Sequence, residues 1–116
     1  MTVRDSETVD SITRSADGAS ITLLMIEDRP FDGSRQQMEQ VVAKVNTYLR
    51  FIQTGQIYRE LPDTLGRALR VRLLCQRAPE DDRMLNALRM AGGMFARHSV
   101  DFGVEVIPPE LVNAGR

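Results

Sequence analysis

Apolar and polar residues alternate with a period of two in several short stretches of the chain, as is typical of β-strands with one buried face. We expect a first strand at residues 9–15 and a return strand at 21–26. The turn between them contains Asp17-Gly18, and Asp-Gly between apolar runs is a strong hairpin signal. Two further strands are predicted at residues 69–75 and 102–106.

A longer stretch after the hairpin has the 3.6-residue period of an amphipathic helix. Its apolar residues form one stripe from Met38 to Ile52, with Lys44 lying away from the stripe and Asn46 beside it. Ser34 followed three residues later by Gln37 predicts a capping box at the helix start. Glycine 55 is placed where such a helix would end, and residues 56–61 are expected to add one more helical turn.

A second helix is predicted after Pro79, a residue suited to a first helical turn. Acidic residues at 80–82 fit the positive end of its dipole, and an apolar stripe then continues to Phe95. Gly92-Gly93 lies inside this helix, where each glycine costs about 1 kcal/mol relative to alanine. We expect close packing of the helix at these glycines to offset that cost.

The resulting order, β-β-α-β-α-β, predicts an α/β (α+β-like) two-layer sandwich of about four strands with two helices on one face. If the sheet grows in chain order, both crossover helices fall on the same side. The 116 residues suit a single domain, 1–116, with residues 1–8 and 110–116 expected to fray.

The first helix also resembles a known family. Residues 44–55 read Lys-Val-Asn-Thr-Tyr-Leu-Arg-Phe-Ile-Gln-Thr-Gly. They are similar to the Lys-Ile-Asn-x-Tyr-x-x-Phe-Ile-x-x-Gly helix that follows an N-terminal hairpin in a family of small bacterial domains of unknown function. Residues 9–12, Val-Asp-Ser-Ile, are similar to that family's opening strand. The resemblance implies a compact α/β domain and carries no activity or site.

Composition argues against several chemistries. The net charge of −1 provides no overall attraction to nucleic acid, and no apolar run is long enough to span a bilayer. The polar segment at residues 1–11 and a single cysteine, Cys75, favour a reducing cytoplasm. Cys75 falls in phase with an apolar strand face, so we expect it to be buried, and His98 is the only histidine. No cofactor, catalytic group or metal site is therefore predicted.

The face of the sheet turned away from the helices gives the main functional hypothesis. Leu24, Ile26 and Leu74 are expected there as an apolar patch bordered by Arg72, and exposed patches of this kind often mark interfaces. A homodimer would bury the patch. The open alternative is that the C-terminal tail, through Leu111 and Val112, folds over it.

A second candidate surface lies on the second helix, where Ala87, Met90 and Met94 recur beside the main stripe. Methionine-rich surfaces adapt to partners, although methionines also fill ordinary cores. Together the two surfaces predict a non-enzymatic interaction or accessory domain that binds itself and another, unknown protein.

Two alternatives use charged residues. Asp28 and Asp32, after the second strand, could serve a small-molecule or cation-binding domain. Arg14, Arg70 and Arg72 are expected to share the open sheet face. Nucleic-acid binding there is disfavoured, because the central strands carry no aromatic residue on which bases could stack.

Overall fold

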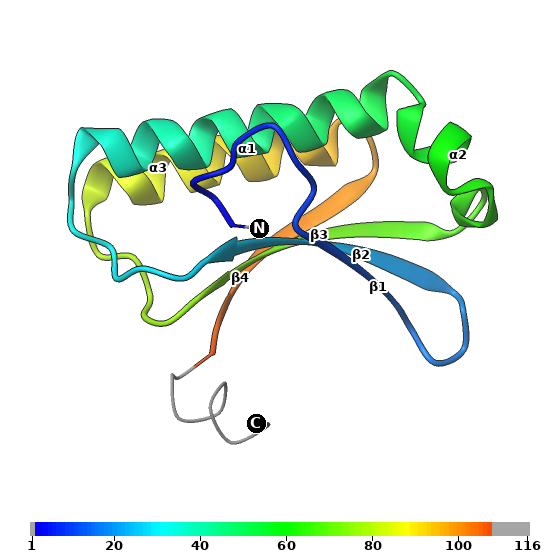
Figure 1. Cartoon of the computed structure of the whole chain (residues 1–116), viewed down its shortest axis with the longest axis horizontal. Coiled ribbons are helices and arrows are strands. Elements are labelled where there is room, and N and C mark those ends of the chain that lie inside the picture. The colour runs from blue at the N-terminus through cyan, green and yellow to red at the C-terminus, as the bar shows by residue number, and fades with distance from the viewer. Residues whose placement is uncertain (1, 108–116) are drawn as a thin grey trace.

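The computed structural model describes residues 2–107, which form one four-stranded sheet with its helices on one side (Figure 1). In chain order the elements are β1 (Ser11–Arg14), β2 (Ser20–Glu27), α1 (Arg35–Gln53), α2 (Gln56–Glu60), the 3₁₀ turn η1 (Pro62–Thr64), β3 (Ala68–Cys75), α3 (Asp82–Ala96) and β4 (Val100–Val106). None of the helices in this range is long and apolar enough to cross a membrane. The tail with Leu111 and Val112 lies outside the described residues.

The sheet grows in chain order, β1-β2-β3-β4, and this confirms the predicted architecture. β1 runs antiparallel to β2, whereas β2, β3 and β4 are parallel. Each parallel connection contains a long helix, and α1 and α3 lie side by side on the same face of the sheet (Figure 1). The opposite face of the sheet is covered by no helix of the described chain.

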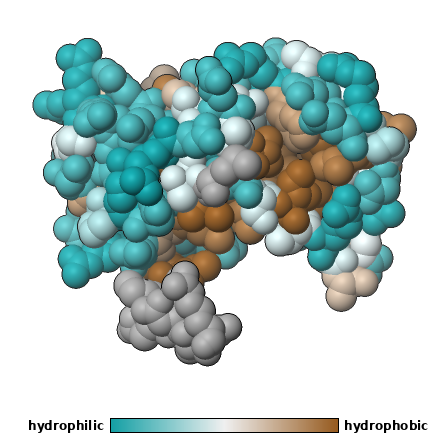
Figure 2. Space-filling view, in the orientation of Figure 1, coloured by the Kyte–Doolittle hydropathy of each residue, from teal (hydrophilic) through white to brown (hydrophobic). Residues whose placement is uncertain are grey.

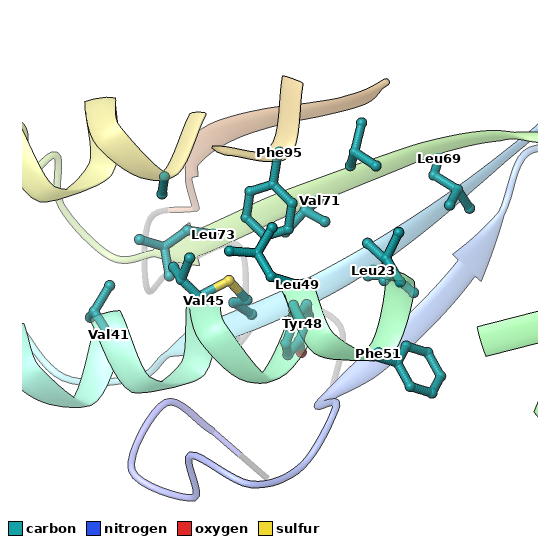
Figure 3. Packing of buried hydrophobic residues seen from close by; sticks show 14 of the residues in the cluster. Leu23, Val41, Val45, Tyr48, Leu49, Phe51, Leu69, Val71, Leu73 and Phe95 are labelled. Atoms are coloured by element: carbon teal, nitrogen blue, oxygen red, sulfur yellow. The ribbon is translucent and has the colours of Figure 1, made fainter. Parts of the chain in front are cut away.

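The core lies between the sheet and the two long helices (Figure 3). Alternate residues of β2 and β3 point into it because side chains alternate between the faces of a strand. Phe95 of α3 is fully buried, and its ring stacks on that of Phe102 in β4 with centroids 5.4 Å apart. The apolar residues that meet here are Leu23, Val41, Val45, Leu49, Val71 and Leu73, together with Phe95.

The ends of α1 follow the predicted signals, with one difference. The Ser34 hydroxyl accepts the N–H of Gln37 at 3.1 Å, and Gly55 follows the helix with φ at 78°. The Gln37 side chain does not return to the Ser34 N–H as a capping box requires. It bonds the Pro30 carbonyl and the Asp32 N–H, so it secures the loop before the helix.

β1 is shorter than predicted, and Arg14 lies on the face of the sheet opposite to the predicted one. Register pairs Arg14 with Ile21, which is buried beneath the helices, so the Arg14 side chain lies on the helix side of the sheet. Its guanidinium bonds the carboxylate of Asp63 in η1 at 2.8 Å. The prediction that Arg14 shares the open face was therefore wrong, and Arg70 and Arg72 remain there.

The glycines of α3 do not mark a tight contact. A Cβ on Gly92 would meet the Phe102 ring at 3.9 Å, an ordinary contact, and one on Gly93 would meet nothing within 4 Å. The close packing predicted for this pair is therefore absent. Among the described residues, no close packing contact at either glycine offsets the helix-propensity cost of the pair.

Candidate functional site

The segment before β1 is attached to α1 through a buried ion pair. Lys44 Nζ lies 2.6 Å from Asp10 Oδ1, and neither side chain is exposed to solvent. The ammonium also donates to the Asp5 carbonyl and, at 3.3 Å, to the Thr8 hydroxyl. The position of Lys44 away from the apolar stripe suggests a side chain that faces solvent. The structure instead buries Lys44, because the N-terminal segment covers that side of α1.

Side chains of this cluster complete the edge of β2 beyond the end of β1. The second oxygen of Asp10 accepts the Ile26 N–H at 2.9 Å, and the Val3 N–H donates to the Ile26 carbonyl at 2.7 Å. The Tyr48 hydroxyl donates to the Leu24 carbonyl and accepts the Asp10 N–H at 2.8 Å. Backbone groups that a longer β1 would have paired are satisfied in this way.

This cluster explains the Lys-x-x-x-Tyr spacing of the family-like helix. Residues four apart lie on one helix face, so Lys44 and Tyr48 both reach Asp10. Val3, near the start of the same segment, is fully buried, in contrast to the fraying expected for residues 1–8. Since Lys44 and Tyr48 are closed to solvent, the cluster positions the N-terminal segment and offers no reactive group to a ligand.

The acidic residues after β2 are held by separate partners. Glu27 is buried, and the Arg29 guanidinium donates hydrogen bonds to both of its carboxylate oxygens, at 2.9 and 3.0 Å. Asp28 pairs with Arg4 at 3.3 Å, whereas Asp32 accepts the Ser34 N–H at 2.8 Å, and its bonds to Ser34 lower the pKa of its carboxyl. Within residues 2–107 the structure brings together no group of three or more His, Cys, Asp or Glu side chains suited to a metal ion.

The open face of the sheet contains the predicted apolar residues as neighbours. Ile26 and Leu74 are register partners on β2 and β3, and Leu24 lies one pleat away beside Arg72. All three apolar side chains are partly exposed. Ile107 continues the β4 ladder by donating its N–H to the Cys75 carbonyl at 2.7 Å. Ile26, Leu74 and Ile107 line part of a shallow hollow of about 250 Å³.

Arg72 lies flat across β4 at the border of this patch. Its guanidinium donates to the Asp101 carboxylate at 2.6 Å and lies 3.6 Å from Glu105. The side chain passes over Gly103, where an added Cβ would lie 3.3 Å from Arg72 Nε. The bond from Arg72 lowers the pKa of Asp101. The border residue predicted from sequence is thus part of a charge-balanced network.

Met90 and Met94 line a different surface, on the opposite side of the molecule. Together with neighbours on α1 they form an apolar groove between the two long helices, with a volume of about 150 Å³. Met90 is 61% exposed and Val42 is 39% exposed. We call this the α1–α3 groove; it is lined by Val41, Val42, Val45, Asn46, Ala87, Met90, Ala91 and Met94.

A larger hollow, of about 520 Å³, lies where α1, α2 and the segment before β1 meet. Partly exposed apolar surface is visible on this side of the molecule, between the helix layer and the strands (Figure 2). Charged and amide side chains from three separate segments line the hollow beside apolar ones. They are Glu7, Thr8, Val9, Ile12, Thr47, Arg50, Phe51, Gln56, Glu60 and Leu61.

Cys75 is buried as predicted, and burial raises the pKa of its thiol, with the nearby Glu27 carboxylate adding to the effect. A raised pKa keeps the sulfur protonated and poorly nucleophilic. His98 lies exposed in the turn after α3. It precedes Val100 at the start of β4, whereas Cys75 pairs with Val106 at the end of that strand, so His98 and Cys75 lie at opposite ends of the β3–β4 pair.

The sequence could not reveal the 520 Å³ hollow. Its residues come from the N-terminal segment, the end of α1 and α2, and no periodic pattern connects them. Similarly, binary patterning assigns Lys44 to solvent. The available signal for its burial was the shared resemblance of residues 9–12 and 44–55 to one family.

Comparison with known proteins identifies a family but no activity. The model of a family of unknown function, DUF6572, matches residues 1–108. No curated protein and no solved structure gives a significant match.

Proposed function

Given that the chain belongs to DUF6572, a family of unknown function, we propose that it is a protein-interaction domain that self-associates through the open face of its sheet. The observation that carries this proposal is the apolar patch of Leu24, Ile26 and Leu74 on a face that no described helix covers. Sheets with such faces pack against one another about 10 Å apart with their strands aligned within about 30°.

The register supports pairing of the face with itself. Ile26 and Leu74 are partners on adjacent strands, so a two-fold axis parallel to the strands, between β2 and β3, sets Ile26 of one copy over Leu74 of the other. The same axis sets β1 over β4. The Thr13 hydroxyl then faces the Asp101 carboxylate, which lies in the same row of the sheet.

The border of the patch also suits an interface. Burial of an unpaired charge costs several kcal/mol. Arg72 already has carboxylate partners in Asp101 and Glu105 within its own chain. Packing of a second copy beside it therefore leaves no charge without a partner. An apolar centre with a polar, hydrogen-bonding rim is the usual composition of protein–protein interfaces.

Sedimentation or light scattering of the purified full chain tests this proposal. We expect a dimer that Leu24→Arg and Leu74→Arg each convert to a monomer while the melting temperature changes little, since both side chains are already partly exposed. Met90→Arg, on the helix side, is the matched control and retains the dimer. A wild-type monomer at high concentration, or dimers of both leucine variants, would contradict the assignment.

Small-molecule binding is the second candidate, and the 520 Å³ hollow favours it because ligand sites commonly measure about 300–1,000 Å³. The hollow lies away from Asp28 and Asp32, the residues for which the sequence suggested this role. A thermal-shift screen with divalent ions and phosphorylated metabolites distinguishes the sites. A shift lost in Arg50→Ala places the ligand in the hollow, one lost in Asp28→Asn places it after β2, and no shift across the panel argues against this candidate.

A further inference from the structure

The hollow of about 520 Å³ has an apolar floor built from four parts of the chain. Phe51 of α1 is 6% exposed, whereas Val9, Ile12 and Leu61 pack against the core and remain partly exposed. The surface of these three side chains is open to a molecule that enters the hollow. Its burial by an apolar group would favour binding through the hydrophobic effect.

Charged side chains of both signs stand around this floor. Glu7 of the segment before β1, Arg50 of α1 and Glu60 of α2 line the hollow, and each is exposed. Among residues 2–107 none of the three has an opposite charge within ion-pair distance. The hollow therefore presents two carboxylates and one guanidinium, each from a different wall, to whatever occupies it.

Neighbouring charges leave this balance unchanged. Most charged residues on the adjoining segments are already in ion pairs. The pairs are Arg4 with Asp28, Lys44 with Asp10, and Arg14 with Asp63. Asp5 and Arg59 are close to the lining in sequence without being part of it, and their charges are of opposite sign. The Arg59 guanidinium also donates to the Thr54 carbonyl, at 3.1 Å.

We infer that the hollow binds a short apolar peptide with free termini, whose ammonium group lies against Glu7 and Glu60 and whose carboxylate lies against Arg50. This inference rests on the second candidate function, small-molecule binding in the hollow, and is independent of self-association through the sheet. A guanidinium pairs with a carboxylate through two parallel hydrogen bonds, and an ammonium group donates three. The apolar side chains of the peptide cover the floor.

Other classes of ligand match only part of the lining. A purely anionic ligand, such as a phosphate ester, pairs with Arg50 but meets Glu7 and Glu60 as like charges. A purely cationic ligand meets Arg50 as a like charge. A neutral apolar ligand covers the floor and takes water from all three charged groups without replacing it, which costs free energy. Only a ligand with both signs of charge and an apolar body satisfies the whole lining.

Isothermal titration calorimetry of the full chain with four dipeptides tests the inference. Leu-Leu has all three features, whereas N-acetyl-Leu-Leu lacks the ammonium group, Leu-Leu amide lacks the carboxylate, and Gly-Gly lacks the apolar side chains. We expect Leu-Leu to bind at least about tenfold more tightly than each of the others, since each has lost one set of contacts. Added salt should weaken Leu-Leu most, because it has both charged ends.

Variants assign each end of the peptide to a wall of the hollow. Arg50→Ala should weaken Leu-Leu by about tenfold and leave Leu-Leu amide within about twofold, because the amide has no carboxylate to lose. Glu60→Gln should weaken Leu-Leu and leave N-acetyl-Leu-Leu unchanged. Arg89→Ala and Glu80→Gln are the matched controls. They remove the same charges from exposed positions outside the hollow and should change affinity by less than about twofold.

The outcomes distinguish the class of ligand from the site itself. Absence of Leu-Leu binding, equal binding of Leu-Leu and its blocked forms, or control variants with effects as large as that of Arg50→Ala would overturn the inference. If Leu-Leu does not bind but a phosphorylated metabolite gives a thermal shift that Arg50→Ala abolishes, the hollow remains a ligand site of another class. No response to the dipeptides or to the metabolite panel removes both proposals, and neither result bears on the sheet interface.

Discussion

Lys44 and Asp10 form an ion pair at 2.6 Å with both side chains fully buried, and this pair fixes the N-terminal segment to the middle of α1. The other oxygen of Asp10 occupies the place of a missing strand residue by accepting the Ile26 N–H. One carboxylate therefore links a helix, a loop and the edge of β2. The N-terminal segment is consequently part of the folded domain, and Val3 near its start is fully buried.

Removal of one partner of this pair should be strongly destabilising. Lys44→Met leaves the Asp10 carboxylate buried without its counter-charge, and we expect a loss of about 3–5 kcal/mol in the free energy of unfolding. Asp10→Asn combined with Lys44→Met should recover part of that loss, because the amide oxygen of asparagine still accepts the Ile26 N–H. Urea unfolding of Lys44→Met and of the double variant, compared with the wild type, measures both effects.

Arg50→Met is the control for this series, since Arg50 lies on the same helix but is exposed and has no ion pair among the described residues. We expect it to change stability by less than about 0.5 kcal/mol. A loss for Lys44→Met no greater than that for Arg50→Met would show that the buried pair does not hold the segment.

Tyr48→Phe should destabilise the domain through lost hydrogen bonds alone. The hydroxyl bonds the Leu24 carbonyl and the Asp10 N–H, so its removal leaves two backbone groups without partners, at a cost of about 1–3 kcal/mol. Hydrogen exchange at the Asp10 amide should accelerate. Tyr58→Phe removes a hydroxyl that makes no hydrogen bond within residues 2–107, and should be close to neutral. Equal effects of the two variants would contradict this account.

The architecture could be predicted because periodicity and turn chemistry agree in most segments. The alternation in β2 and β3, the Asp17-Gly18 turn and the Ser34 cap each specify local structure, and the open face follows from the register of β2 with β3. Asp10 and Lys44 could not be paired in this way, because their contact depends on a tertiary arrangement of distant segments. For the α1–α3 groove, the sequence predicted the surface of Met90 and Met94 on α3. It did not reveal the residues of α1 that form the other wall.

The α3 glycines should prove replaceable. Since Gly93 has open space where its Cβ would lie, Gly93→Ala should stabilise the domain by about 0.5–1 kcal/mol through helix propensity alone. Thermal unfolding measures the gain. Gly66→Ala is the contrasting control: the space there is also open, but φ is 82°, a conformation that alanine disfavours, so it should destabilise. Destabilisation by Gly93→Ala would reveal a constraint on α3 that the structure does not show.

Cys75 should resist modification while the domain is folded. Burial raises the pKa of its thiol, so at pH 8 the folded protein holds less thiolate than the unfolded chain does. The raised folded-state pKa also means that this group's contribution to stability is lost as pH rises through the thiol's titration range. We expect the rate of reaction with a disulfide reagent to be low and to rise steeply across the urea transition. Rapid reaction in the absence of urea would indicate local opening at β3.

Gly103 should matter for the charge network of the open face rather than for the fold. In Gly103→Ala the new methyl would lie 3.3 Å from Arg72 Nε, so the Arg72 side chain must shift by a few tenths of an ångström, and we expect this shift to weaken its bond to Asp101. Because Arg72 holds the pKa of Asp101 below its ordinary value of 3.8, that pKa should rise in the variant. In the wild type the pair contributes above the unfolded-state pKa and is lost as pH falls through the lower, folded-state pKa. An NMR titration of the Asp101 carboxyl measures the shift, and Arg72→Gln should raise the same pKa if the guanidinium is its cause. An unchanged Asp101 pKa in both variants would mean that Arg72 does not control the charge at this border.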